Sequence, residues 1–140
     1  MSNKKIIVDA NVIIRAVLGN KVISILTEHS QHVHFYTPDI CFKDAQKYLP
    51  QLFIKHNKSD VLALEILGSL KKFIHTVDVQ AYEIFESKAK ARIQHRDIED
   101  WPIVACSLLL NSPVWTHDTD FFGTGVSTWT TETVNLYLTD

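Results

Sequence analysis

Short runs of apolar and β-branched residues alternate along this chain with longer segments whose apolar residues recur every three or four positions. A short apolar run bounded by polar or turn-forming residues is typical of a buried strand, and the longer spacing is typical of a helix with one buried face. We therefore predict strands over residues 6–8, 33–36, 74–77, 114–116 and 127–129. We predict helices over residues 11–18, 22–29, 37–52, 60–70, 79–95, 97–110 and 131–138.

Strands separated by helices form parallel sheets that are covered on both faces. The predicted fold class is therefore α/β: a three-layer α/β/α sandwich around a mainly parallel sheet of four to five strands. We expect Thr37 to cap the third helix with Pro38 at its first position, and Pro50 to bend or split that helix. The helix over residues 97–110 is much more apolar than the helix before it, so we expect it to be central.

The composition fits one globular domain over residues 1–140, with 46% hydrophobic and 21% charged residues. A net charge of −2 excludes a strongly basic protein that holds nucleic acid by bulk charge alone. Cys41 and Cys106 cannot form a disulfide framework, and their apolar surroundings predict buried packing residues. The longest nearly apolar stretch, residues 101–110, is about half a membrane span, so we expect a cytoplasmic protein without membrane contact.

Acidic residues directly follow the predicted strands or stand on the helices beside them. Asp9 directly follows the first strand, and Asp118 follows the strand over residues 114–116. Parallel strands bring their carboxyl ends to one edge, which is where α/β sheets bind ligands. The acids that we expect at this edge are Asp9, Asp44, Asp97, Asp100, Asp118 and Asp120.

Carboxylates crowded at one edge repel each other and raise each other's pKa values. A divalent cation removes that conflict, and ligand sets made only of oxygen suit Mg²⁺ or Mn²⁺ rather than zinc. Mg²⁺ takes few protein carboxylates and leaves room for the phosphate oxygens of a substrate. Because such a metal activates water and stabilises the charge of an in-line displacement, the acidic set predicts phosphodiester hydrolysis.

Most of these acids also have a structural interpretation. Acidic residues cap helices, serve turns or stand in solvent, and these interpretations apply to Asp97, Asp100, Asp118, Asp120 and Asp44. Asp9 is the hardest to explain in this way, because the end of a buried strand gives a carboxylate no solvent. Asn11 either caps the following helix or orients Asp9, and the cap is the favoured interpretation. The prediction of a metal site therefore rests on the set.

Four segments resemble the motifs of the PIN domain family, the fold of VapC-type toxins and related ribonucleases. Residues 7–14 (IVDANVII) are similar to the family's opening strand, aspartate and helix, and residues 37–44 (TPDICFKD) resemble the segment that leads to its second acidic residue. Residues 96–105 (RDIEDWPIVA) resemble its third acidic motif, and residues 116–121 (THDTDF) resemble its closing Thr-x-Asp-x-Asp-Phe segment. The last two motifs are the most specific.

The resemblance implies a Mg²⁺- or Mn²⁺-dependent endoribonuclease that hydrolyses phosphodiester bonds of single-stranded RNA. It implies that Asp44 or Asp97 orients the attacking water. Asp44 stands where the family usually has glutamate, and with one methylene fewer it reaches the metal through water or not at all. The metal ligands implied are Asp9, Asp100 and Asp118, with Asp97 and Asp120 at accessory acidic positions.

Four further residues complete the predicted site on the side of the substrate. Arg96 and Lys43 are candidate phosphate contacts, and Arg96 is favoured because it adjoins an acidic motif. Thr116 matches the family's small hydroxylic residue beside the metal, and Asn11 stands next to Asp9 in the chain. His117 is either a general base or, as we favour, a structural residue at a strand end.

The toxin branch of the family implies two protein partners besides the RNA substrate: an antitoxin and a second copy of the chain. The alternative function is a PIN-like module that binds RNA or protein with weak or no catalysis. The aspartate at position 44 and the absence of a basic surface favour it, whereas the other acidic positions oppose it. A phosphatase with an aspartate nucleophile is disfavoured, because Asn11 occupies the position where such enzymes commonly have a second acid.

Overall fold

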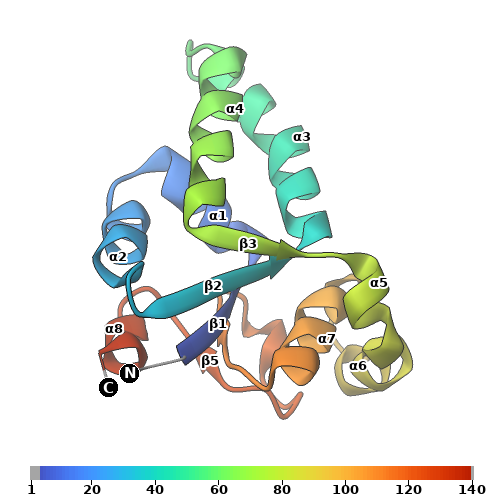
Figure 1. Cartoon of the computed structure of the whole chain (residues 1–140). Coiled ribbons are helices and arrows are strands. Elements are labelled where there is room, and N and C mark those ends of the chain that lie inside the picture. Colours follow the sequence, from blue (N-terminus) through green and yellow to red (C-terminus); the bar gives the residue numbers. More distant parts are fainter. Residues whose placement is uncertain (1–3, 140) are drawn as a thin grey trace.

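A single parallel sheet forms the centre of the computed structural model, which describes residues 4–139. The strand order is β3-β2-β1-β4-β5, and all four neighbouring pairs are parallel (Figure 1). This confirms the predicted α/β class and a sheet at the upper end of the expected four to five strands. The strands are β1 (Lys4–Val8), β2 (Val33–Pro38), β3 (Ile74–Val77), β4 (Val114–Trp115) and β5 (Thr128–Trp129).

Helices cover the sheet on both sides (Figure 1). One group packs together and against β2 and β3, and it consists of α1 (Ala10–Leu18), α2 (Lys21–His29), α3 (Asp39–Lys55) and α4 (Asp60–Ser69). On the other side α7 (Trp101–Leu110) lies against β1 and β2, flanked by α5 (Val79–Tyr82) and α6 (Glu86–Ile93). The last helix, α8 (Val134–Leu138), is joined to β1 by a 2.8 Å hydrogen bond from the Tyr137 hydroxyl to the Lys5 carbonyl.

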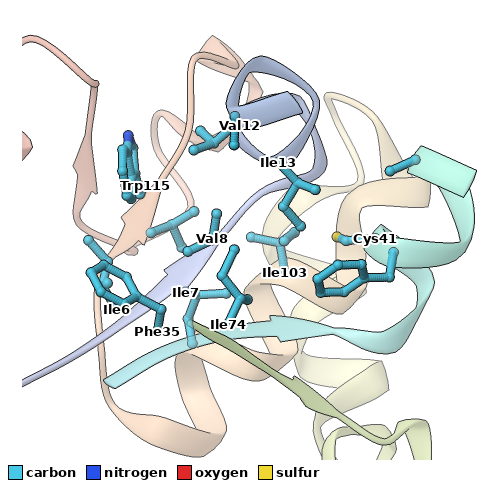
Figure 2. Packing of buried hydrophobic residues seen from close by; sticks show 14 of the residues in the cluster. Ile6, Ile7, Val8, Val12, Ile13, Phe35, Cys41, Ile74, Ile103 and Trp115 are labelled. Atoms are coloured by element: carbon cyan, nitrogen blue, oxygen red, sulfur yellow. The ribbon is translucent and has the colours of Figure 1, made fainter. Parts of the chain in front are cut away.

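The core lies between the sheet and these two helix layers (Figure 2). Ile6, Ile7 and Val8 are fully buried between two covered faces, which explains why this part of β1 carries only apolar residues. Trp115 is also fully buried in β4, with its ring centroid 6.2 Å from that of Phe35 in β2. In α7 every residue from 102 to 107 is buried, so the prediction that this helix is central is confirmed.

The start of the third helix differs from the prediction. Thr37 belongs to β2, and its hydroxyl donates a 2.6 Å hydrogen bond to the Val8 carbonyl, so it is unavailable as a cap. Helix α3 begins at Asp39 with Pro38 before it, and no side chain caps it. Pro50 does not split the helix, because Leu49 and Phe53 are buried on either side of it and hold both halves against the core.

The predicted helix over residues 79–95 is wrong in its continuity. A 3₁₀ turn over Glu83–Phe85 separates α5 from α6. Tyr82 explains the break: its hydroxyl donates a 2.9 Å hydrogen bond to Asp39 Oδ1, and its ring packs edge-on against Trp101. This anchor fixes the end of α5 independently of the direction of α6.

The helices can be compared with membrane spans by their length and hydropathy. Between residues 4 and 139, no single helix is both long and apolar enough to cross a bilayer. Helices α1 and α2 reach that length and hydropathy only as a pair, and the pair is bent by 107°.

Candidate active site

The carboxyl ends of β1 and β4 bring two segments of the predicted site together. The two strands pair in parallel with Val8 opposite Trp115, and the Asp9 amide donates a 3.0 Å hydrogen bond to the Trp115 carbonyl. Asp9 therefore stands beside Thr116, although the two residues are 107 positions apart. This is the sheet edge at which ligand binding is expected in an α/β fold.

Asp9 is 6% exposed and uses both carboxylate oxygens. Oδ1 accepts a 2.7 Å hydrogen bond from the Ala10 amide and caps α1. Oδ2 accepts a 2.6 Å hydrogen bond from the Thr116 hydroxyl and a 3.2 Å bond from Asn11 Nδ2. Burial raises the pKa of Asp9, and the charge of Asp118 raises it further, while these hydrogen bonds oppose the shift.

Asn11 connects both strand ends and does not cap the helix. Besides its bond to Asp9, its amide nitrogen lies 3.3 Å from the Thr116 hydroxyl, and its Oδ1 accepts a 3.2 Å bond from the His117 amide. Because Asp9 is the cap of α1, the favoured interpretation of Asn11 as the cap is wrong. The geometry supports its alternative role, the orientation of Asp9.

The same hydrogen-bonded chain continues into the segment after β4. The Asp118 amide donates a 3.0 Å bond to the Thr116 hydroxyl, and the Asp120 amide donates a 2.9 Å bond to Asp118 Oδ1. Asp118 caps the short 3₁₀ turn over Thr119–Phe121. Asp97 likewise caps the turn over Ile98–Asp100 through a 3.1 Å bond from the Glu99 amide. These two acids therefore have structural roles as well as places near the site.

Asp100 carries the strongest electrostatic conflict in the cluster. It ends the turn that leads into α7, is half-buried, and has a pKa raised to about 8. Burial is the largest cause, followed by the charges of Asp9, Asp118 and Asp97. Its Oδ2 is buried and has no hydrogen-bond partner among the described residues. A buried carboxylate oxygen without a partner is costly and calls for a ligand.

A small pocket of about 60 Å³ lies beside Asp100. Asp9, Asp44 and Asp100 line it, although Asp44 comes from the exposed side of α3. Glu99 also lines it, and this residue was not predicted to belong to the site. Its place inside the acidic segment 97–100 was the available signal, but spacing alone does not reveal that the 3₁₀ turn brings it to the pocket.

A second, overlapping group extends the acidic cluster. One oxygen each from Asp97, Asp100 and Asp120 lies within 4.8 Å of the others. Arg96 Nη1 stands 4.0 Å from Asp120 Oδ1, at the rim of this group. Lys43 is exposed on α3 next to Asp44 and does not line the pocket. The structure thus brings all six predicted acids to one region, with Asp100 common to both groups.

His117 and Cys41 lie close to the acids without taking part in the cluster. His117 Nε2 makes a 2.7 Å hydrogen bond with the Thr131 hydroxyl, and burial and the charge of Arg15 lower its pKa. This partner supports the structural interpretation of the imidazole. Cys41 is buried against the pocket wall, and burial raises the pKa of its thiol, so it is the packing residue that was predicted.

The acidic cluster fits a divalent cation by its chemistry. Its donors are carboxylate oxygens, one of them is buried and unpartnered, and the pKa of Asp100 reflects the mutual repulsion that a cation would remove. Hard cations such as Mg²⁺ and Mn²⁺ prefer such oxygen ligands. Within the protein itself, the Thr116 hydroxyl and the Asn11 amide hold the Asp9 carboxylate in position.

Comparison with known proteins gives a consistent result. The chain matches the sequence model of the PIN domain family over residues 7–139. No curated protein matches it significantly. Three solved structures with low sequence identity share its fold. The crystal structure of VapBC2 from Rickettsia felis, bound to a DNA fragment from its promoter, has a TM-score of 0.71 at 10% identity and covers 90% of this chain and 98% of its own.

The other two structures also match over most of both chains. FitAB bound to an IR36 DNA fragment has a TM-score of 0.61 at 19% identity, with 90% of this chain and 94% of its own covered. VapBC-1 from nontypeable Haemophilus influenzae has a TM-score of 0.60 at 16% identity, with 91% and 98% covered. Because the family match extends over nearly the whole sequence and the parallel sheet agrees with it, the chain belongs to the PIN domain family.

Proposed function

We propose that this protein is a Mg²⁺- or Mn²⁺-dependent endoribonuclease that hydrolyses phosphodiester bonds of single-stranded RNA. The observation that carries the proposal is the unpartnered buried oxygen of Asp100, a residue that lines one small pocket together with Asp9 and Asp44. A fold without a ligand at this point retains a destabilising cluster of carboxylates. Membership of the PIN domain family supports nuclease chemistry as the reason why the protein has this cluster of carboxylates.

The candidate metal ligands are the acids that surround this oxygen. In the proposal Asp9, Asp100 and Asp118 hold the cation, and Asp120 supports them from the adjoining group. A bound Mg²⁺ or Mn²⁺ supplies activation of a water and stabilisation of the negative charge that develops on the phosphate. Asp97 is both near enough to Asp100 to join the cluster and tied to its own turn by a backbone hydrogen bond.

The protein's own groups then position water and substrate. Asp44, which lines the pocket from α3, orients the attacking water, with Asp97 as the alternative residue for this role. Thr116 and Asn11 hold Asp9 in place through their hydrogen bonds. Arg96 at the rim and Lys43 on the exposed side of α3 neutralise phosphates of the bound strand.

We also propose that the protein is the toxin of a toxin–antitoxin pair. The resemblance to VapC-type toxins and the shared fold with proteins of VapBC and FitAB structures support this. Exposed apolar side chains on α4 support a protein partner, antitoxin or second copy: Val61, Leu62 and Leu64 are 58%, 43% and 44% exposed. A helix that is apolar around its whole circumference is normally buried.

A PIN-like module that binds RNA without cutting it is the second candidate. The observation in its favour is Asp44, which is exposed and shorter than the glutamate usual in the family. The six acids at one sheet edge oppose it, since a pure binding module gains nothing from a cluster that repels phosphate.

The experiment that separates the two candidates is a cleavage assay on labelled single-stranded RNA. Purified protein is incubated with Mg²⁺, with Mn²⁺, with EDTA, and with EDTA followed by excess metal. The ribonuclease proposal predicts shorter products with metal, none with EDTA, and their return when metal is added back. RNA binding that survives EDTA, with no products under any condition, would establish the binding module instead.

A further inference from the structure

A pocket of about 360 Å³ with two cationic side chains lies at the far end of α1 from Asp9. Arg15, from the last turns of α1, and Lys21, the first residue of α2, line it together with Thr131 and Glu132. We call these four residues the basic pocket. Helix α1 ends at Leu18 and α2 begins at Lys21, so a turn of two residues brings both cations to the same hollow.

Two sets of residues connect the basic pocket to the acidic site. Asn11, which holds Asp9, and Arg15 are four positions apart and share one face of α1, about 6 Å apart along the axis. On the β4 side, His117 follows Thr116 and bonds through Nε2 to Thr131, which lines the basic pocket. A strand of substrate that passes over Asn11 and His117 therefore reaches from one pocket to the other.

The two cations of the basic pocket are open to solvent. Arg15 and Lys21 are exposed, and neither forms an ion pair with any residue between 4 and 139. Among residues 4–139, Glu132 is the only acid that lines the pocket. The formal charge of the pocket is therefore positive, in a protein whose net charge is −2. A positive site at the other end of α1 from the carboxylates separates the two functions of attracting phosphate and holding a cation.

We propose that the basic pocket binds backbone phosphates of the RNA strand that flank the cleaved bond. The inference rests on the proposed ribonuclease function, since it assigns an RNA-binding role to the surface next to that site. Arg15 offers a planar fork of donors that matches two phosphate oxygens, and Lys21 adds a point charge. Contacts of this kind fix the position of the strand without reading its bases.

An acidic segment of a protein partner is the competing occupant of a positive pocket. The connection to the acidic site favours RNA, because a strand already held there at one phosphate presents its next phosphates along Asn11 and His117. An acidic peptide has no phosphate for the proposed cation site to hold, so that site gives it no reason to follow this line. The test therefore measures RNA first and treats a protein ligand as a contradicting outcome.

The test is the salt dependence of RNA binding, measured by fluorescence anisotropy with labelled single-stranded RNA. Asp100→Asn protein in EDTA is used throughout, so that no cleavage occurs. In this background the double substitution Arg15→Gln with Lys21→Gln is compared with Lys88→Gln, an exposed lysine on α6 across the sheet. Glu132→Gln removes a negative charge from the pocket, so its effect on RNA binding is expected to have the opposite sign.

We expect the double substitution to weaken RNA binding and to reduce the slope of log K against log salt by about 1.4, since each single-strand phosphate contact contributes about 0.7. Lys88→Gln is expected to leave both quantities unchanged, and Glu132→Gln to tighten binding. Equal affinity and slope in the double variant and in Lys88→Gln would overturn the proposal. Loss of binding to an acidic protein partner, with RNA binding intact, would also overturn it.

Turnover separates this proposal from the proposed function. If wild-type protein with Mn²⁺ cleaves RNA, the double substitution is expected to raise KM, and an unchanged KM would count against the basic pocket alone. If no RNA is cleaved while the double substitution still lowers affinity and slope, the ribonuclease function fails and the RNA-binding role of the pocket stands.

Discussion

The hydroxyl of Thr116 donates a 2.6 Å hydrogen bond to Asp9 Oδ2 and so joins the ends of two adjacent strands. The Thr116 hydroxyl oxygen also accepts a 3.0 Å bond from the Asp118 amide. One buried hydroxyl therefore sets the positions of two of the carboxylates proposed to hold the metal. Such positioning groups matter because a ligand set must be held near its working geometry before the ion arrives.

Replacement of Thr116 by valine tests this role. Valine keeps the shape of the side chain but leaves an oxygen of buried Asp9 and the Asp118 amide without this partner. We expect a loss of about 1–3 kcal/mol in the free energy of unfolding, together with weaker metal binding. Urea denaturation and a Mn²⁺ titration measure the two effects. Thr116→Ser, which keeps the hydroxyl, is the control, and equal losses in both variants would contradict the account.

The raised pKa of Asp100 predicts how pH acts on the protein without metal. Its value of about 8 lies above that of an unfolded aspartate, so the folded state binds the proton more tightly. The resulting stabilisation is complete below about pH 4 and is lost as pH rises to about 8. We expect the urea midpoint in EDTA to fall across this interval in the wild type more than in Asp100→Asn. Parallel curves for the two proteins would contradict the assignment.

Metal binding should have the opposite pH dependence. A cation displaces the proton from Asp100, so Mg²⁺ affinity is expected to rise up to about pH 8 by as much as tenfold per pH unit for one released proton. The measurement is the increase in Tm produced by Mg²⁺ at pH 6 and at pH 8. A larger increase at pH 6 would show that Asp100 does not bind the ion as a carboxylate.

Asp44 offers a direct test of the departure from the family pattern. Because Asp44 lines the same pocket as Asp9, Asp44→Glu is expected to increase the cleavage rate by bringing the carboxylate closer to the water that it orients. Asp44→Asn is expected to reduce the rate on the order of 100-fold, the scale of a general base. Equal kcat in Asp44→Asn and the wild type would assign the orienting role to Asp97 instead.

Gly125 supports the segment that follows the acidic motif. It has φ of +82°, and a Cβ there would lie 2.8 Å from Arg92 Nη1, which donates a 3.0 Å bond to the Thr124 carbonyl. Gly123 has a similar φ of +84° with open space around it. We expect Gly125→Ala to destabilise the fold by about 1 kcal/mol more than Gly123→Ala, the value of the lost hydrogen bond. Urea denaturation of both variants checks this difference.

The sheet and its acidic edge were predictable because their signals are local. Asp9 stands directly after a buried apolar strand, and a charged residue at that point is meaningful whatever the rest of the chain does. Helix α7 was predictable for the same reason, since its apolar residues are consecutive. In both cases a few neighbouring residues determine the burial.

The remaining features depend on contacts between distant segments. The residues next to Asn11 in the chain predict a helix cap. Its partners Thr116 and His117 lie more than a hundred positions away. The break after Tyr82 follows from a hydrogen bond to Asp39, 43 positions earlier. Glu99 enters the pocket only because residues 98–100 form a 3₁₀ turn. None of these follows from spacing along one segment.

The central claim is that the acidic cluster around Asp100 binds a divalent cation and cuts RNA. Asp100→Asn removes one charge from the cluster with little change in shape, and Asp60→Asn makes the same change in the exposed first turn of α4 as a control. The decisive measurement is the rate of single-stranded RNA cleavage in Mn²⁺ by wild type and both variants, each shown by urea denaturation to be folded. The account predicts that Asp60→Asn cleaves like wild type and that Asp100→Asn falls to the rate of wild type in EDTA. Cleavage by folded Asp100→Asn at the wild-type rate would contradict it.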